Sequence, residues 1–239
     1  MERNGTFSSS SIWKLTTLNK QKQPFGAQGE KYIKQVGYEK GLGRPIQNES
    51  NAKQTAWGTF VQHRVFDLLS NEYTMIEGEK RYVHPTIENW TGVPDTAIFN
   101  KKVVGDIKCP YNLEVFCDKV EALSAGLSTY KDEYPDDYWQ HISNAILLRE
   151  NGHEINFFEA ILYVPYREEL AEIRLSAANF DGDQNKIAFL NWADDNELPY
   201  LIEGKKYKNL NVFRYEIDEN DVEHLTECVK LANERLKKA

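Results

Sequence analysis

Apolar residues recur along this chain with two periods, one typical of helices and the other typical of strands. Between residues 52 and 69 they return every three or four positions, which predicts an amphipathic helix. Residues 28–40 show the same period and are followed by the helix-ending sequence Gly-Leu-Gly-Arg-Pro at 41–45. Four serines at 8–11 can cap a short helix over residues 12–15. We expect the two longer helices to bury Tyr32, Ile33, Val36, Tyr38, Trp57, Phe60, Val61, Val65, Leu68 and Leu69.

Beyond residue 80 the pattern changes to short apolar runs bounded by turn residues, which predicts strands. A hairpin is expected at residues 95–108, where Ile98 and Phe99 end the first arm, Asn-Lys-Lys at 100–102 forms the turn, and residues 103–105 begin the second arm. Further strands are expected at 82–84, 159–165 and 213–217, further helices at 134–148 and 218–238, and loops over most of 176–209.

These elements predict one α/β domain, residues 1–239, with a central mixed β-sheet flanked by helices and an N-terminal helical segment. We divide it into a helical, basic part (1–70), a catalytic core (80–165), and a C-terminal strand and helix (166–239).

The expected hairpin carries two carboxylates and an ammonium group. Strand side chains alternate between faces, so Asp106 and Lys108 should point to one side and Ile107 should be buried on the other. In-register pairing would bring Asp95, which follows Pro94, across from them. Two adjacent carboxylates suit Mg²⁺, with Mn²⁺ as an alternative, and a lysine can hold a phosphate oxygen. Asp-x-Lys alone is common on exposed strands, but its combination with Pro-Asp predicts a metal-dependent phosphodiesterase.

Composition narrows the class of protein. The 239 residues include 28% charged residues, 5 Trp, 13 Tyr and 11 Phe, as expected for a folded protein with a large core. The net charge is −8, yet residues 1–64 hold ten basic against four acidic residues, or +6, which leaves −14 for the other 175. This distribution suits a protein that meets phosphate groups along one surface, although an ordinary solvated face would explain it equally well.

The cysteines and the N-terminal sequence indicate in which cellular compartment we expect the protein. Three cysteines without a Cys-x-x-Cys pair indicate reduced thiols, and they argue against a four-cysteine iron–sulfur cluster. The N-terminal sequence does not resemble a secretion signal, and no apolar run approaches the length of a membrane span. We therefore expect a cytoplasmic protein, encoded by a bacterium or a phage, with no membrane partner.

The order of several motifs resembles one known family of nucleases. These motifs are Arg3-x-Gly5 with Ser8-Ser9-Ser10, Ala56-Trp57-Gly58, Pro94-Asp95, Asp106-Ile107-Lys108-Cys109-Pro110 and Tyr138-Trp139-Gln140. They are similar to the motifs of the phage lambda-type exonucleases, in the YqaJ-like viral recombinase branch of the PD-(D/E)xK superfamily. The resemblance implies a restriction-endonuclease-like core. It also implies that Asp95 and Asp106 are metal ligands and that Lys108 positions or activates the attacking water.

The chain departs from the family at one metal-binding position. Four residues after the glycine, where the family has a glutamate, this chain has Gln62. A glutamine can ligate through its carbonyl oxygen but brings no charge, so a second metal ion would bind more weakly. The neighbouring His63 could supply a nitrogen ligand instead. Successive helical residues point about 100° apart, so Gln62 and His63 cannot both face one site.

Three further residues match family positions. Gln140 matches a glutamine that touches the substrate or a metal-bound water, and its alternative is an ordinary surface position. Arg3 and Ser10 match residues that hold the 5′-phosphate of a DNA end. Arginine binds phosphate through two hydrogen bonds, and a helix start adds backbone donors.

The resemblance implies a Mg²⁺-dependent deoxyribonuclease that degrades one strand of linear duplex DNA from its 5′ end. It also implies a trimeric ring, and a single-strand annealing protein as a partner in phage recombination. Two alternatives stay open. One is an endonuclease or a Cas4-like processing nuclease of the same fold. The other, suggested by Gln62, is a catalytically weakened module that binds DNA ends.

Overall fold

The computed structural model describes residues 5–22, 24–46, 53–69, 80–180 and 184–238. A four-stranded sheet lies at the centre, with strand order β4-β5-β6-β7. Its strands β5 and β6 are parallel, and the β4–β5 and β6–β7 pairs are antiparallel, so the sheet is mixed as predicted. The strand bounds are β4 Thr96–Ile98, β5 Val103–Lys108, β6 Phe157–Tyr163 and β7 Leu210–Glu216.

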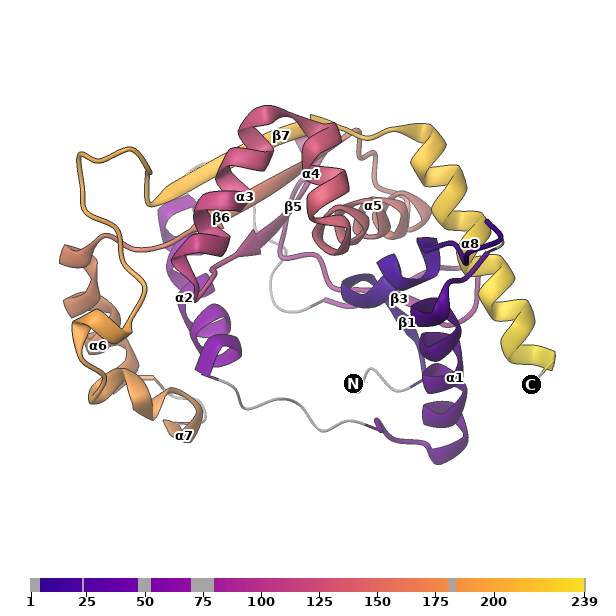
Figure 1. Ribbon diagram of the computed structural model, residues 1–239, viewed down its shortest axis with the longest axis horizontal. Coiled ribbons are helices and arrows are strands. Elements are labelled where there is room, and N and C mark those ends of the chain that lie inside the picture. Colours follow the sequence, from indigo (N-terminus) through magenta and orange to yellow (C-terminus); the bar gives the residue numbers. More distant parts are fainter. Residues whose placement is uncertain (1–4, 23, 47–52, 70–79, 181–183, 239) are drawn as a thin grey trace.

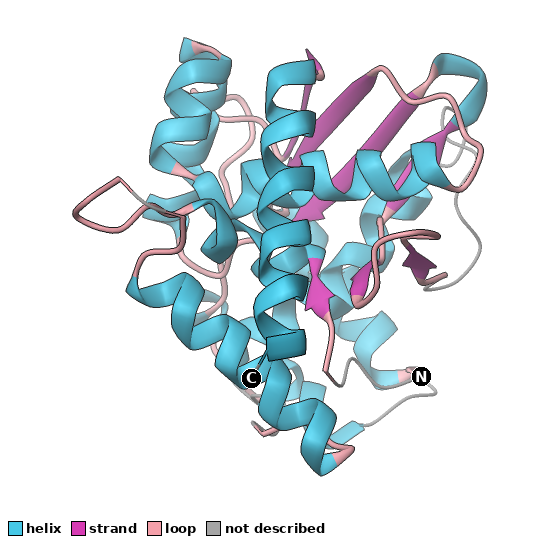
Figure 2. Cartoon of the chain, turned by 90° about the vertical axis from the view of Figure 1, so that its right-hand side faces the viewer, coloured by secondary structure: helices cyan, strands magenta, loops and turns pink. Residues whose placement is uncertain are grey.

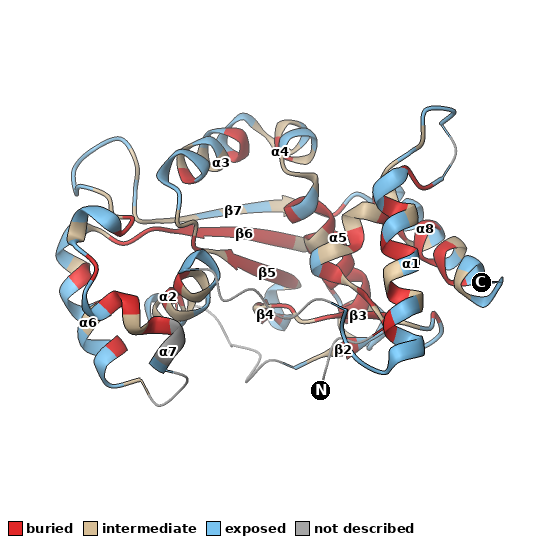
Figure 3. Cartoon of the chain, turned by 60° about the horizontal axis from the view of Figure 1, so that its bottom comes forward, coloured by how far each residue is buried: buried red, intermediate tan, exposed pale blue. Residues whose placement is uncertain are grey.

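Helices cover both faces of this sheet (Figure 1). One face packs against α3 (Leu113–Ala125), α4 (Leu127–Glu133) and α5 (Pro135–Glu150). The opposite face packs against α2 (Lys53–Leu69), α6 (Leu170–Ala178) and α7 (Gln184–Ile187). Strands β5 and β6 between these layers are almost fully buried, whereas the residues of β7 at the edge are half-buried or exposed (Figure 3). This arrangement of layers confirms the predicted fold class.

The N-terminal part adds a second, smaller sheet that the sequence pattern did not predict. Its strands are β1 (Phe7–Ser8), β2 (Tyr82–Val83) and β3 (Trp90–Gly92), in the order β1-β3-β2. The β1–β3 pair is parallel and aligns Phe7 with Trp90, so it joins segments about eighty residues apart. The segment after β1 is a short 3-10 helix, η1 (Ser9–Thr16), so the short helix expected there forms. The expected serine cap was wrong, because Ser8 at the N-cap makes no side-chain hydrogen bond to the helix.

The remaining helices follow the sequence pattern closely. Helix α1 (Ala27–Leu42) ends at Gly43, which adopts the left-handed conformation with φ of 67°. Helix α8 (Glu219–Lys238) is capped by Asp218, whose Oδ1 accepts a hydrogen bond from the Asn220 amide, and runs to the C-terminus beside α1 (Figure 2). Two predicted core positions are exposed instead, Tyr38 on α1 and Leu68 on α2, because they lie at the edges of their apolar faces.

The expected loop region at 176–209 contains short helical turns. These are α7, η4 (Ala188–Asn191) and η5 (Asp195–Glu197), and the unassigned segment after Pro110 proves to be α3 and α4. Two further short turns are η2 (Phe99–Lys101) and η3 (Arg167–Glu169). Among the described residues, no helix has both the length and the apolar character needed to cross a bilayer.

Candidate active site

The predicted hairpin forms and determines where the three key side chains lie. Strands β4 and β5 pair with Thr96 opposite Gly105, which places Asp95 beside Asp106. Oδ2 of Asp95 accepts a hydrogen bond of 2.7 Å from the backbone amide of Ile107. Ile107 itself packs into the apolar cluster beneath α2, as the alternation of side chains predicted. The carboxylates of Asp95 and Asp106 and the ammonium group of Lys108 therefore meet at the carboxyl end of β5.

Helix α5 closes this cluster from one face of the sheet. Gln140 bridges its two charged partners: Nε2 donates to Oδ1 of Asp106 at 2.5 Å, and Oε1 accepts from Nζ of Lys108 at 3.0 Å. Nζ of Lys108 also lies 2.8 Å from Oδ2 of Asp106, so each of the three groups contacts the other two. The side chain of Asp106 is only 2% exposed. A buried carboxylate in this setting requires positive charge nearby, which Lys108 supplies.

Helix α2 approaches the same carboxylates from the opposite face. Its Gly58 lies over the backbone carbonyl of Cys109, and a Cβ at this position would sit 3.7 Å from that oxygen. One turn later, the side chain of Gln62 hydrogen-bonds the Asp95 carboxylate. His63 is exposed, and its ring lies against Phe66 instead. Of the two neighbouring candidates, the structure brings Gln62 to the carboxylates and leaves His63 on the outer side of the helix.

The carboxylates are electrostatically strained. Burial, followed by the charge of Asp106, raises the pKa of Asp95 to about 7 despite the hydrogen bonds from Ile107 and Gln62. The neighbouring anions Asp106 and Asp137 outweigh burial and raise the pKa of Lys108, so its side chain is a firmly held cation. A buried carboxyl group whose pKa is raised beside a second carboxylate belongs to a site whose energy falls when a further cation binds.

The available donors fit a Mg²⁺ ion. Asp95, Asp106 and Gln62 offer oxygen atoms, the ligands that this hard cation prefers. Within the described ranges, no cluster of three or more His, Cys, Asp or Glu side chains is arranged to hold a metal ion. A Mg²⁺ ion needs no such cage, because it keeps several waters and binds through one or two carboxylates together with substrate phosphates.

Two charged residues that sequence reasoning missed extend the cluster. Asp137 on α5 lies one turn before Gln140, with Oδ1 3.6 Å from Nζ of Lys108. Its other oxygen, Oδ2, is paired with Lys119 of α3. The i, i+3 spacing of Asp137 and Gln140 was a readable signal, because it puts both side chains on one face of the helix.

A small pocket adjoins the cluster on the side of η1. Its lining residues in the described part of the chain are Ser8, Ser9, Ser10, Arg81, Thr91, Gly92, Val93 and Gln140, and none of these is acidic. Ser10 therefore lines a polar pocket. Gln140 lines the same pocket and also contacts the carboxylate of Asp106. Arg3 lies outside the described residues. Arg81, which precedes β2, was not singled out from the sequence.

Gly92, which lines this pocket, is closely packed from below. A Cβ on Gly92 would lie 2.2 Å from Oγ of Ser9 and 2.6 Å from Oδ1 of Asn144, so any larger residue would displace both. Asn144, one turn after Gln140 on α5, is 1% exposed, and within the described chain neither polar atom of its amide has a hydrogen-bond partner. A buried amide without partners is costly.

Comparisons with known proteins agree with this fold. No protein-family model and no curated protein matches the sequence. Among solved structures, the alkaline exonuclease LHK-Exo from Laribacter hongkongensis is similar, with a TM-score of 0.60, 14% identity, and coverage of 99% of this chain and 90% of that one. The chain shares the fold of this exonuclease. Its complex with dAMP gives a TM-score of 0.61 at the same identity and coverage.

A second exonuclease has the same fold. The phage-related exonuclease from Haemophilus somnus 129PT is 12% identical, with a TM-score of 0.61 and coverage of 98% of this chain and 94% of that one. The likeness extends over nearly the whole of both chains, so the fold expected from the motif resemblance is confirmed.

Proposed function

We propose that the protein is a Mg²⁺-dependent deoxyribonuclease, acting as a 5′-to-3′ exonuclease on linear double-stranded DNA. The observation that carries the proposal is the convergence of Asp95, Asp106, Lys108 and Gln140 at the end of β5. This cluster lies in a fold shared with two exonucleases over nearly the full length of the chain. We further propose that residues 1–239 act as one nuclease domain, because the two apolar clusters share a single sheet.

The pocket beside the cluster supports an enzyme that works from a DNA end. Its hydroxyl groups and the guanidinium of Arg81 are phosphate-binding groups, and none of the described residues that line it carries a carboxylate to repel an anion. Gln140 belongs to both the pocket and the catalytic cluster, so a 5′-phosphate held by Ser10 and Arg81 would lie next to the reacting bond. LHK-Exo has been crystallised with dAMP, a nucleoside monophosphate. Release of such monophosphates is the product pattern that we expect here.

In the proposed mechanism each residue of the chain has a distinct role. Asp95 and Asp106 would hold the Mg²⁺ ion, with Gln62 orienting Asp95. Such an ion would supply an activated water and neutralise charge on the phosphate. Lys108 donates hydrogen bonds from its ammonium group to a phosphate oxygen as negative charge builds there. Gln140 keeps Lys108 and Asp106 at their mutual distance. Attack in line with the departing 3′-oxygen then releases a 5′-mononucleotide.

The substrate class suggests an assembly and a partner. We propose that the chain forms a closed homo-oligomer, a trimeric ring around the duplex, and works with a single-strand annealing protein. A ring would place the basic N-terminal part toward DNA and leave the acidic remainder outside. Light scattering at several protein concentrations measures the mass of the particle directly. A monomer that digests DNA processively would contradict the ring.

The test of the activity is digestion of linear duplex DNA labelled at either end, with and without a 5′-phosphate, in Mg²⁺ or in EDTA. We expect the 5′ label to be released first, only with the metal ion, and Lys108→Ala to slow its release by about a thousandfold. Lys101→Ala, an exposed lysine in the hairpin turn, is the matched control and should digest normally. Cutting of closed circular DNA would indicate an endonuclease, and DNA binding without any digestion would indicate a binding module.

A further inference from the structure

The ammonium group of Lys108 is surrounded by three protein oxygens. Nζ lies 2.8 Å from Oδ2 of Asp106, 3.0 Å from Oε1 of Gln140 and 3.6 Å from Oδ1 of Asp137. Only Asp106 among these is a proposed metal ligand. The other two are on α5, three residues apart, and reach Lys108 from the same face of the helix. Helix α5 therefore holds the lysine independently of the metal-binding carboxylates.

Asp137 is itself fixed by a second lysine. Its Oδ2 pairs with Nζ of Lys119 on α3, and both side chains are largely buried, at 8% and 12% exposure. The ammonium of Lys119 also lies 5.1 Å from the ring centroid of Tyr134, which restricts where it can move. Lys119 neutralises Asp137 from the side opposite Lys108. Each oxygen of the Asp137 carboxylate therefore pairs with one lysine, Oδ1 with Lys108 and Oδ2 with Lys119, so neither oxygen is available to a metal ion.

We propose that Asp137, anchored by Lys119, is the positioning residue that aims Lys108 at the substrate phosphate. The proposal rests on the proposed nuclease function. A cation bound at Asp106 competes with Lys108 for that carboxylate and weakens one of the three contacts of the ammonium group. Asp137 is outside this competition, because its two oxygens pair with Lys108 and Lys119, so it keeps Nζ in place when a cation is bound. Gln140 is not, since its Nε2 donates to Asp106. The burial of Asp137 supports a specific role, because a charged carboxylate is rarely buried without one.

The pKa of Asp137 agrees with this geometry. Burial alone would raise it, but Lys108 and Lys119 outweigh burial and hold the pKa of this carboxyl below its usual range. Asp137 therefore carries its charge in the folded protein at neutral pH. The four groups Asp106, Lys108, Asp137 and Lys119 alternate in sign, so each lysine lies next to a carboxylate.

The experiment compares single-turnover digestion of linear DNA by Asp137→Asn and by Asp136→Asn. Asp136 is the neighbouring exposed carboxylate in the same first turn of α5, so its variant controls for charge loss at the helix start. We expect Asp137→Asn to lower kcat by about 10- to 100-fold, as misplacement of a reacting group does. The KM for DNA and the affinity for Mn²⁺, measured by electron paramagnetic resonance, should change by less than about twofold.

A double variant separates positioning from an independent role. If Asp137 acts through Lys108, adding Asp137→Asn to Lys108→Ala should cause no further loss of rate, because the group to be positioned is gone. Equal rates for Asp137→Asn and Asp136→Asn would overturn the proposal, as would a full additional loss in the double variant. A fall in Mn²⁺ affinity in Asp137→Asn would make Asp137 a metal ligand and overturn it as well.

Two further variants cover the remaining outcomes. If Asp137→Asn fails to fold, Lys119→Met tests the same anchor and should lower kcat by about three- to tenfold with KM unchanged. A Lys119→Met enzyme with normal kcat would then count against the proposal. The failure of the proposed function looks different, because the unmodified protein would then show no metal-dependent digestion, or Lys108→Ala would digest DNA at the same rate as the unmodified protein.

Discussion

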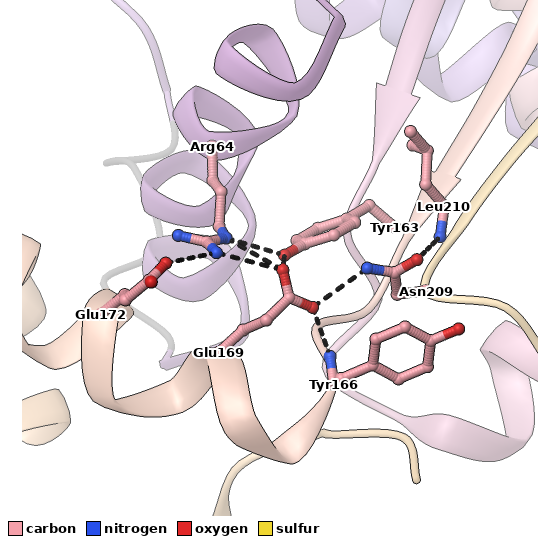
Figure 4. A network of polar contacts seen from close by, with 7 residues as sticks. All are labelled: Arg64, Tyr163, Tyr166, Glu169, Glu172, Asn209 and Leu210. Atoms are coloured by element: carbon pink, nitrogen blue, oxygen red, sulfur yellow. Dashed lines mark hydrogen bonds and ion pairs between the residues drawn. The ribbon is translucent and has the colours of Figure 1, made fainter. Parts of the chain in front are cut away.

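Two buried polar clusters lie on opposite faces of the central sheet, and they differ in how well their charges are matched. In the cluster around Glu169, the carboxylate accepts hydrogen bonds from Arg64, Tyr163, Asn209 and the backbone amide of Tyr166 (Figure 4). Every oxygen there has a donor. In the candidate active site, two carboxylates share one ammonium group, and Oδ2 of Asp106 meets only Lys108, in poor hydrogen-bond geometry.

The pKa shifts express the same contrast. Despite burial, hydrogen bonds from its neighbours hold the pKa of Glu169 below its ordinary value, whereas burial and Asp106 raise that of Asp95 to about 7. The cluster around Glu169, in which each oxygen of that carboxylate has a hydrogen-bond donor, joins α2 to the turn before α6 and stabilises the fold. The active-site cluster has too few donors for its like-charged carboxylates, and binding of a cation and a substrate would lower its free energy. Substitutions in the Glu169 cluster should therefore change mainly stability, and substitutions in the active-site cluster should change mainly activity.

The largest effect is expected from Lys108→Ala. Removing an ammonium group beside the developing phosphate charge should reduce the rate of digestion by about a thousandfold, the scale measured when one such donor is removed. The melting point should fall as well, because the buried carboxylates of Asp106 and Asp137 lose their counter-charge. Steady-state digestion, expressed per folded molecule, and a thermal melt of the same sample measure both. Digestion at the normal rate by the folded variant would contradict the role of Lys108.

Asp95→Asn should stabilise the metal-free protein at alkaline pH. The folded-state pKa of about 7 lies above the unfolded value of 3.8, so the stability linked to this proton is full below pH 3.8 and is lost as pH rises through 7. An asparagine loses no proton and still accepts from Ile107. Above pH 7 in EDTA the variant should therefore be about 2–4 kcal/mol more stable.

Urea unfolding of both proteins at pH 5 and pH 8 measures the Asp95→Asn effect. Adding Mg²⁺ at a hundred times its Kd should then stabilise the original protein by about 2.7 kcal/mol and the variant by much less. A constant stability difference between the two pH values would contradict the strain assigned to Asp95.

Arg64→Met tests the cluster around Glu169. It removes an ion pair whose partner, Glu169, is 16% exposed, and keeps much of the apolar stem. We expect a loss of about 2 kcal/mol in the free energy of unfolding, measured with urea. Glu172→Gln removes only an exposed contact of the same arginine and should cost under about 0.5 kcal/mol. Activity per folded molecule should be retained in both, and its loss in Arg64→Met would give this cluster a functional role.

The hairpin of the active site could be predicted from the sequence, but the choice between Gln62 and His63 could not. The hairpin was predictable because Asp106, Ile107 and Lys108 lie in a regular strand, whose side-chain alternation is fixed by covalent geometry. Which of Gln62 and His63 faces the carboxylates depends on how α2 is rotated about its axis, and the local sequence pattern does not fix that rotation. Packing of Trp57, Val61 and Val65 determines that rotation and leaves His63 outside.

Features made by distant segments escaped prediction. The parallel pairing of Phe7 with Trp90 carries no local signal, and it places η1 beside α5. Arg81 faces the pocket only because β2 joins that same small sheet. Asp137 looked like a helix-start residue, and its pairing with Lys119 depends on how α3 packs against α5. Such contacts are set by tertiary packing, which single-sequence patterns do not encode.

The smallest effect is expected in the pocket, where function should depend on the DNA end and not on the chemical step. Arg81→Met should lower the preference for 5′-phosphorylated over 5′-hydroxyl ends by about tenfold, and Ser10→Ala by about threefold, because a charge-assisted hydrogen bond contributes more than a neutral one. The ratio of kcat/KM for the two kinds of end is the measurement. Rates on 5′-hydroxyl ends should hardly change, since the carboxylates and Lys108 are untouched. If both kinds of end slowed equally, the pocket would belong to the same functional unit as the strained cluster, and end recognition would have to lie elsewhere on the protein.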